Sequence, residues 1–105
     1  MINQANTIYV IQYDFTLGEN ITVPDNCVLE FEGGSISGNY NIVCDNTYIV
    51  TDCNVFDCNV KGTVSNSVVD AVWIKNATSE RLQFLISEKA SCNDIKQSSN
   101  DMLFL

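Results

Sequence analysis

The chain has 105 residues, of which 46% are hydrophobic and 17% are charged, and its formal net charge at pH 7 is −8. This composition is typical of one small folded domain, and the acidic balance argues against nucleic acid or an anionic membrane as a partner. The sequence has no histidine, which excludes histidine-based acid–base chemistry and histidine metal ligands.

The N-terminal residues, MINQANTIYVIQ, show neither the basic start nor the apolar core of a secretory signal. The chain also has no apolar run near the roughly 20 residues of a membrane span. We therefore expect the cysteines to be reduced thiols with mostly structural roles, and a disulfide or a bound metal is the alternative. The sequence has five of them: Cys27, Cys44, Cys53, Cys58 and Cys92.

Four asparagines recur with one constant spacing: Asn6, Asn26, Asn46 and Asn66. A small residue and then two apolar residues follow each of them. Asparagine tolerates the left-handed backbone conformation of a sharp corner, and its amide both donates and accepts hydrogen bonds. We therefore predict that the four side chains lie over one another as a structural ladder. The alternative is coincidence in a chain that is rich in asparagine.

Between these corners the chain carries short runs rich in Val, Ile, Thr, Tyr and Phe, which favour β-strands. A period of about 20 residues with such runs is typical of a solenoid in which each coil is one repeat. The Leu-x-x-Leu-x-Leu frame of leucine-rich repeats is missing. We therefore predict a parallel β-helix over residues 1–75, with about three and a half coils.

In the second coil the residues CVLEFEGG alternate in polarity. This pattern predicts a strand in which Leu29 and Phe31 point inward. Val28, Glu30 and Glu32 would then share the outer face. The two glycines that end this run are expected to turn the chain.

The pattern changes after residue 75. Residues 76–91 place Leu82, Leu85 and Ile86 at helical spacing, which predicts one short amphipathic α-helix that caps the open end of the solenoid. Residues 92–105 are expected to form a polar loop and the start of a further strand, MLFL. Because a domain rarely ends on its most apolar stretch, we expect the chain to be the front of a longer protein.

The segment TIYVIQYDFTLGENITVPDNCVLEFEGGSISG, residues 7–38, resembles the N-terminal part of pectate-lyase-like, right-handed parallel β-helix proteins of Bacteroidetes and their phages. The resemblance extends to about residue 90, and its most specific part is Pro24 to Gly38. It implies an all-β fold of the kind found in polysaccharide-cleaving enzymes and in phage tailspikes and tail fibres. SERLQFLISEKA stands where the family often has a helix, but it keeps only Gln83 of the family's Ala-Ile-Gln core. No catalytic residue of the family can be carried over.

Acidic residues are the candidates for chemistry on a sugar, because glycosidases use two carboxylates across a cleft. If the register follows the asparagine spacing, Glu32 stacks on Asp52 on the outer face. Two like charges so close together either splay into water or share a cation, and their oxygens suit Ca²⁺. Glu32 and Asp52 are therefore candidates for a weak Ca²⁺ site, with a solvated acidic face as the alternative. No other cofactor is expected.

The aromatic residues that could stack on sugar rings if they are exposed are Trp73, Tyr9, Tyr13, Tyr40 and Tyr48. Trp73 and Tyr48 are the candidates, and packing in the core or at its rim is the alternative. We expect the chain to be a non-catalytic structural segment of a phage tail fibre or tailspike, made in the host cytoplasm and carried in the virion. Its expected partners are copies of itself in a homotrimer, other virion proteins and host surface polysaccharide. One alternative is the N-terminal, non-catalytic part of a secreted, extracellular polysaccharide lyase or glycoside hydrolase. A third is a free-standing glycan-binding module.

Overall fold

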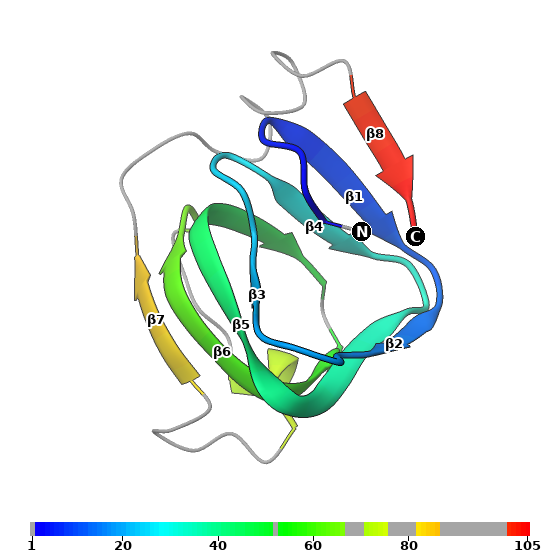
Figure 1. Ribbon diagram of the computed structural model, residues 1–105, viewed down its shortest axis with the longest axis vertical. Coiled ribbons are helices and arrows are strands. Elements are labelled where there is room, and N and C mark those ends of the chain that lie inside the picture. The colour runs from blue at the N-terminus through cyan, green and yellow to red at the C-terminus, as the bar shows by residue number, and fades with distance from the viewer. Residues whose placement is uncertain (1, 52, 67–70, 76–81, 87–100) are drawn as a thin grey trace.

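The computed structural model describes residues 2–51, 53–66, 71–75, 82–86 and 101–105. These residues form eight β-strands and one short 3-10 helix, and they contain no α-helix. The elements are β1 (Thr7–Ile11), β2 (Asp14–Thr16), β3 (Ile21–Thr22), β4 (Val28–Phe31), β5 (Ser35–Val50), β6 (Phe56–Val64), η1 (Ala71–Trp73), β7 (Leu82–Ile86) and β8 (Asp101–Phe104) (Figure 1).

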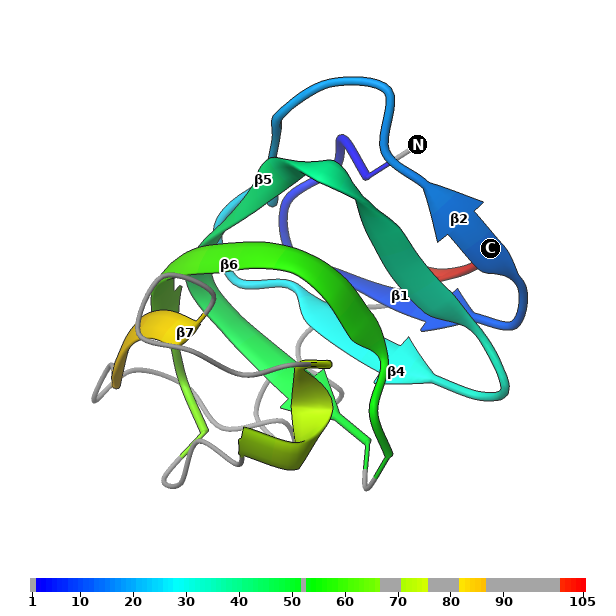
Figure 2. The ribbon, with the colours of Figure 1, turned by 90° about the horizontal axis from the view of Figure 1, so that it is seen from below.

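Every pairing between these described strands is parallel. The strands follow the order β7-β6-β5-β4-β1-β8 in the sheet, and β2 and β3 pair with β5 beside this path. The long strand β5 bends, and the sheet curls around a shared interior as a half-barrel (Figure 1, Figure 2). The predicted all-β class with parallel strands is confirmed.

The strand register follows the spacing of the sequence at first and then shortens. Ile8 pairs with Val28, and Val28 pairs with Tyr48, so the first two steps both match the spacing of the asparagines. Between β5 and β6 two irregularities shift the register, and the pairing of Thr47 with Val64 is a shorter step. Like residues of successive repeats therefore stay aligned through β4 and the end of β5. They also align at the start of β6, where Ile36 pairs with Phe56, and lose alignment after it.

The core is built from apolar residues that lie side by side across the strands. Tyr9, Leu29 and Ile49 occupy matching positions of β1, β4 and β5 and are at most 2% exposed. Phe31 packs against this core and meets Phe56 edge to face, with ring centroids 5.2 Å apart. The predicted inward direction of Leu29 and Phe31 is confirmed.

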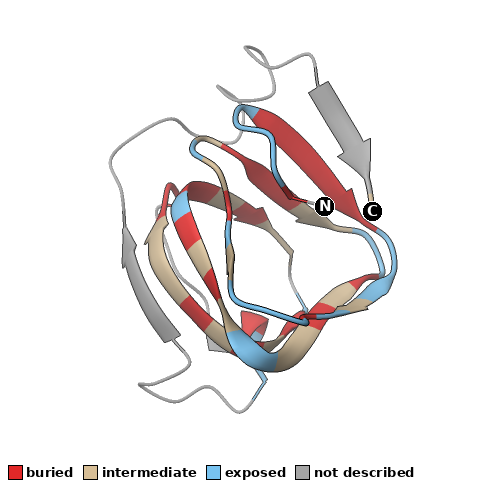
Figure 3. Cartoon of the chain, in the orientation of Figure 1, coloured by how far each residue is buried: buried red, intermediate tan, exposed pale blue. Residues whose placement is uncertain are grey.

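Strand β1 is buried along its whole length (Figure 3). Ile8 and Val10 alternate with the core residues of β1 and, with Val28, form a second apolar cluster. Tyr48 and Val50 pack against this second cluster from β5. The sheet is therefore apolar on both sides here, which the alternation in β4 did not indicate.

The predicted capping helix over residues 76–91 is wrong for the part that the structure describes. Leu82–Ile86 form strand β7, which pairs in parallel with β6 along Val60–Val64. A strand gives hydrogen-bond partners to the backbone groups of β6, which a helix could not supply. The run LQFLI also has an apolar residue at every second position, so it fits a strand as well as a helix. Residues 76–81 and 87–91 lie outside the described part.

The strand expected near the end of the chain is present as β8. It pairs with β1, the first strand of the chain, and not with a later coil. Within the described residues, the last strand therefore closes the edge of the sheet beside the first. The polar loop expected before it, residues 92–100, lies outside the described part.

Candidate functional site

Three of the four repeated asparagines hold left-handed corners of the backbone. Asn6, Asn26 and Asn46 have φ angles of 54°, 61° and 52°, and they are the non-glycine residues with positive φ in the described chain. This conformation costs most residues roughly 1–2 kcal/mol, and asparagine is one of the few that visit it readily. The corners predicted at these three positions are present.

Two of the corner asparagines are joined directly through their side chains. Asn26 donates from Nδ2 to Oδ1 of Asn6 at 2.8 Å. Asn46 donates instead to carboxylate oxygens, to Asp25 Oδ1 at 3.0 Å and to Asp45 Oδ1 at 3.2 Å. An ionised carboxylate is a stronger acceptor than an amide oxygen, so the aspartates that precede these corners take the amide hydrogens.

Asn66 does not continue the series, and the prediction of a fourth ladder position is wrong. Its side chain is 7% exposed and meets the backbone of Ile49. Its Oδ1 accepts from the Ile49 N–H at 2.9 Å, and its Nδ2 donates to the Ile49 carbonyl at 2.8 Å. The shortened register between β5 and β6 explains this shift, because Asn66 lies beside Ile49 and not over Asn46.

The proposed cation site stays a prediction, because Asp52 lies outside the described residues. Glu32 is exposed, and its backbone N–H donates to the carbonyl of Ile11 at 2.8 Å. In the described part of the chain, no three His, Cys, Asp or Glu side chains gather closely enough to hold a metal ion.

The two aromatic candidates for sugar stacking both pack against apolar residues. Trp73 is 4% exposed and belongs to the core, so its proposed role at the surface is wrong and the packing alternative holds. Its carbonyl accepts from the Val55 N–H at 2.9 Å, which holds η1 against the strands. Tyr48 is partly buried against the second apolar cluster. Tyr13, another of the aromatic residues expected to stack on a sugar if exposed, is 70% exposed.

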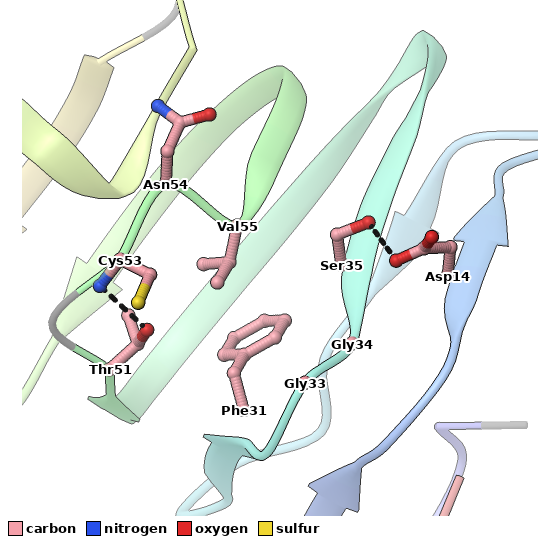
Figure 4. A pocket seen from close by; sticks show the side chains of 9 residues that line it. All are labelled: Asp14, Phe31, Gly33, Gly34, Ser35, Thr51, Cys53, Asn54 and Val55. Atoms are coloured by element: carbon pink, nitrogen blue, oxygen red, sulfur yellow. Dashed lines mark hydrogen bonds between the residues drawn. The ribbon is translucent and has the colours of Figure 1, made fainter.

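A pocket of about 380 Å³ opens at the bend where β4 leads into β5 (Figure 4). Three segments form it: the start of β2, the β4–β5 turn and the residues that follow β5. The lining residues are Asp14, Phe31, Gly33, Gly34, Ser35, Thr51, Cys53, Asn54 and Val55.

The turn beside the pocket depends on close backbone approach at Gly34. A Cβ atom there would lie 2.5 Å from the Tyr13 carbonyl oxygen and 2.7 Å from that of Ile11. Gly34 donates its N–H to the Ile11 carbonyl at 3.2 Å, and Ser35 donates to the Tyr13 carbonyl at 3.3 Å. These contacts bring the Ser35 side chain next to β2.

Polar side chains in the pocket are fixed by hydrogen bonds. Ser35 donates from its hydroxyl to Asp14 Oδ1 at 2.7 Å, and the two residues are register partners of β5 and β2. Thr51 accepts from the Cys53 N–H at 3.1 Å, and Asn54 donates to the Val72 carbonyl at 3.1 Å. Carboxylate, hydroxyl and amide groups around an aromatic ring suit hydrogen bonding to a small polyhydroxylated ligand.

Sequence reasoning missed this pocket, although a signal for it was available. Ser35 follows Asp14 by about one repeat, and Val55 follows Ser35 by another, so the repeat spacing stacks all three. Extending the register from the asparagines to every column of the repeat would have brought these residues together.

The buried thiols are protected from ionisation. Burial raises the pKa of Cys44 to about 12 and also raises the pKa of Cys27. Cys27, Cys44, Cys53 and Cys58 are not joined in disulfides, which agrees with the expectation of reduced thiols for these four. Because the thiolate is the nucleophile, the two thiols with raised pKa values are poor nucleophiles. Cys92 lies outside the described residues.

Comparisons with protein-family models, with curated proteins and with solved structures found no match. Within the described residues, no helix has the length and apolar character needed to cross a membrane.

Proposed function

We propose that the chain is a non-catalytic structural segment of a phage tail fibre or tailspike, folded as a right-handed parallel β-helix. The observation that supports this most is the parallel register of Ile8, Val28 and Tyr48, in which each step is one repeat of the sequence. The left-handed corners at Asn6 and Asn26 recur with the same period. A parallel stack of coils joined by corners is the geometry of a solenoid.

Such a stack suits a mechanical role in a virion. Every coil is held by backbone hydrogen bonds to its neighbours, so the stack resists bending and carries load along its axis. A short stack has a small core relative to its surface, and association covers part of that surface. The chain therefore works as a homotrimer or docked to other virion proteins.

The pocket at the bend between β4 and β5 is the part of the surface that we assign to contact with host polysaccharide. Asp14 and Ser35 present a carboxylate and a hydroxyl, and Phe31 lines the pocket with an aromatic ring. Tyr13, next to Asp14 in the chain, is 70% exposed and adds an aromatic ring to the surface. Aromatic faces with fixed polar groups are how proteins hold sugar rings.

Two measurements test the proposal. Multi-angle light scattering on the full chain is expected to show a homotrimer, and a monomer at every concentration would contradict the assembly role.

Binding to immobilised bacterial surface polysaccharides is expected to fall at least tenfold in Asp14→Asn and in Ser35→Ala. Glu19→Gln removes an exposed carboxylate away from this pocket and is the matched control. Equal binding by all three variants, or no binding by the unaltered chain, would overturn the adsorption role.

A further inference from the structure

Strand β8 occupies the edge of β1 in full register. The pairs run from Thr7↔Asp101 to Val10↔Phe104. The contact continues past the strand, because Leu105 donates its N–H to the Val10 carbonyl and accepts from the Gln12 N–H, each at 2.5 Å. Figure 1 shows β8 alongside β1.

The β1 edge needs a strand of this kind. Tyr9 and Ile11 are 0% exposed, and their strand forms one end of the core. Leu105 packs against the same core. Without β8, the backbone N–H and C=O groups along one side of β1 would have no strand partner, and an open edge of that kind pairs readily with another chain.

The strand that fills this edge comes from far away in the chain. In the sheet order β7 and β8 lie at opposite ends, and residues 87–100 connect them. Among the described strands, β8 pairs with β1 alone, whereas β4 and β1 each pair on both sides. A strand with one neighbour and a long connection is the easiest one to detach, because few contacts are lost and little of the remaining structure changes.

We propose that the β1 edge is a strand-acceptor site for the segment DMLFL, and that a second copy of this chain can supply that segment. In the exchanged dimer each β8 pairs with the β1 of the other copy, with the register of the closed monomer. The same contacts form in both states, so the balance between them depends on loop-closure entropy and protein concentration. This inference stands on the strand pairing and does not depend on the proposed function.

The occupant is specified by the pattern of the segment. Leu103 is the register partner of Tyr9, and Tyr9 is in turn the register partner of Leu29, so all three positions are apolar. Met102 is the register partner of Ile8. The register partners of these two positions, Ile8 and Tyr9, are buried, so an apolar segment fits this edge, and every copy of the chain carries one.

The first experiment uses the full chain and a labelled peptide, SSNDMLFL, which copies residues 98–105. Fluorescence anisotropy is expected to show saturable binding of one peptide per chain, as the peptide displaces the resident β8. A peptide with Leu103→Pro loses a backbone N–H on the same side of the strand as the N–H of Leu105, which faces β1, and is expected to bind at least tenfold more weakly. Equal binding of both peptides, or no binding of either, would overturn the proposal.

The second experiment detects exchange between whole chains. Two differently tagged copies are mixed, held at high concentration, and diluted before gel filtration with light scattering. The expected result is a yield of mixed assemblies above the level reached without the concentrated step, and slow separation of these assemblies on dilution. Excess SSNDMLFL peptide during the concentrated step should reduce their yield at least tenfold. If the peptide leaves the yield above that level unchanged, the copies associate through another surface, which contradicts strand exchange.

Discussion

At the residue scale, the corners of the fold combine a strained backbone with a side-chain hydrogen bond, and the two contributions can be separated. Asn26 has a φ of 61° and donates to Asn6 at 2.8 Å. Glycine at this position adopts the left-handed conformation without strain but cannot form the hydrogen bond. Alanine cannot form the hydrogen bond either, and its backbone is strained in this conformation.

We therefore expect Asn26→Ala to lower the free energy of unfolding by about 2 kcal/mol and Asn26→Gly by about 1 kcal/mol. Urea unfolding followed by intrinsic fluorescence measures both. Asn41→Ala is the control, because Asn41 has no positive φ. If Asn26→Gly is as damaging as Asn26→Ala, the corner does not depend on the left-handed conformation.

The buried thiol of Cys44 makes stability depend on alkaline pH. Its pKa in the folded chain is about 12, against an ordinary value of 9.0. Above the ordinary value the unfolded chain releases this proton while the folded chain keeps it, so the free energy of unfolding falls as pH rises from 9.0 toward 12. We expect Cys44→Ala to show a shallower fall over this window in urea unfolding at a series of pH values. Parallel curves for the two proteins would show that the thiol does not contribute.

At the element scale, the bend from β4 into β5 depends on an absent side chain. A Cβ on Gly34 would lie 2.5 Å from the Tyr13 carbonyl oxygen, a backbone atom that cannot move aside easily. We expect Gly34→Ala to lower the free energy of unfolding by about 2–3 kcal/mol and to disturb the Asp14–Ser35 contact. Gly18→Ala is the matched control, since its Cβ would meet nothing within 4 Å. Thermal unfolding of the two variants should separate them by several degrees.

Strand β7 offers a test that distinguishes a strand from a helix. Threonine favours strands and alanine favours helices, by roughly 0.5 kcal/mol or more in each case. Because Gln83 lies within β7 and pairs with Lys61, Gln83→Thr should leave stability unchanged or raise it, and Gln83→Ala should lower it. The opposite order in urea unfolding would favour the helix.

The features that could be predicted from the sequence are those that depend on neighbouring residues. A corner at Asn6 or Asn26 needs a residue that accepts positive φ, and the alternation around Leu29 sets which side faces the core. The partner of β6 depends on which distant segment completes its edge, and local helical spacing cannot reveal that. Asn66 was misplaced because irregularities in β5 shorten the repeat, and no single residue signals them.

The same limit applies to the candidate site. The pocket residues come from three segments, and only the strand register shows that these segments lie together. Which aromatic residue reaches the surface depends on burial in the fold, and Tyr13 is exposed whereas Trp73 is buried. Trp73 lies in the core, and its carbonyl accepts from the Val55 N–H. Residue type alone gives no information about that contact.

At the scale of the whole molecule, the balance of 13 acidic against 5 basic residues makes copies of the chain repel one another. Charges farther apart than about 30 Å are screened at 10 mM salt, and this distance falls to about 8 Å at 150 mM. We therefore expect association to strengthen, and the melting temperature to rise by a few degrees, between these two salt concentrations. Light scattering and calorimetry in sodium chloride measure the two effects, and the absence of any salt dependence would contradict this account.

The pairing of β1 with β8 also has a consequence for the order in which the chain folds. Most strand pairs join residues about one repeat apart, as Ile8 and Val28 do, whereas Tyr9 and Leu103 lie near opposite ends of the sequence. Contacts close in sequence form first, because they restrict the chain less. The strands from β1 to β6 can therefore pair early, while the outer edge of β1 is still without a partner. Refolding should then end in a separate slow phase in which β8 docks on β1.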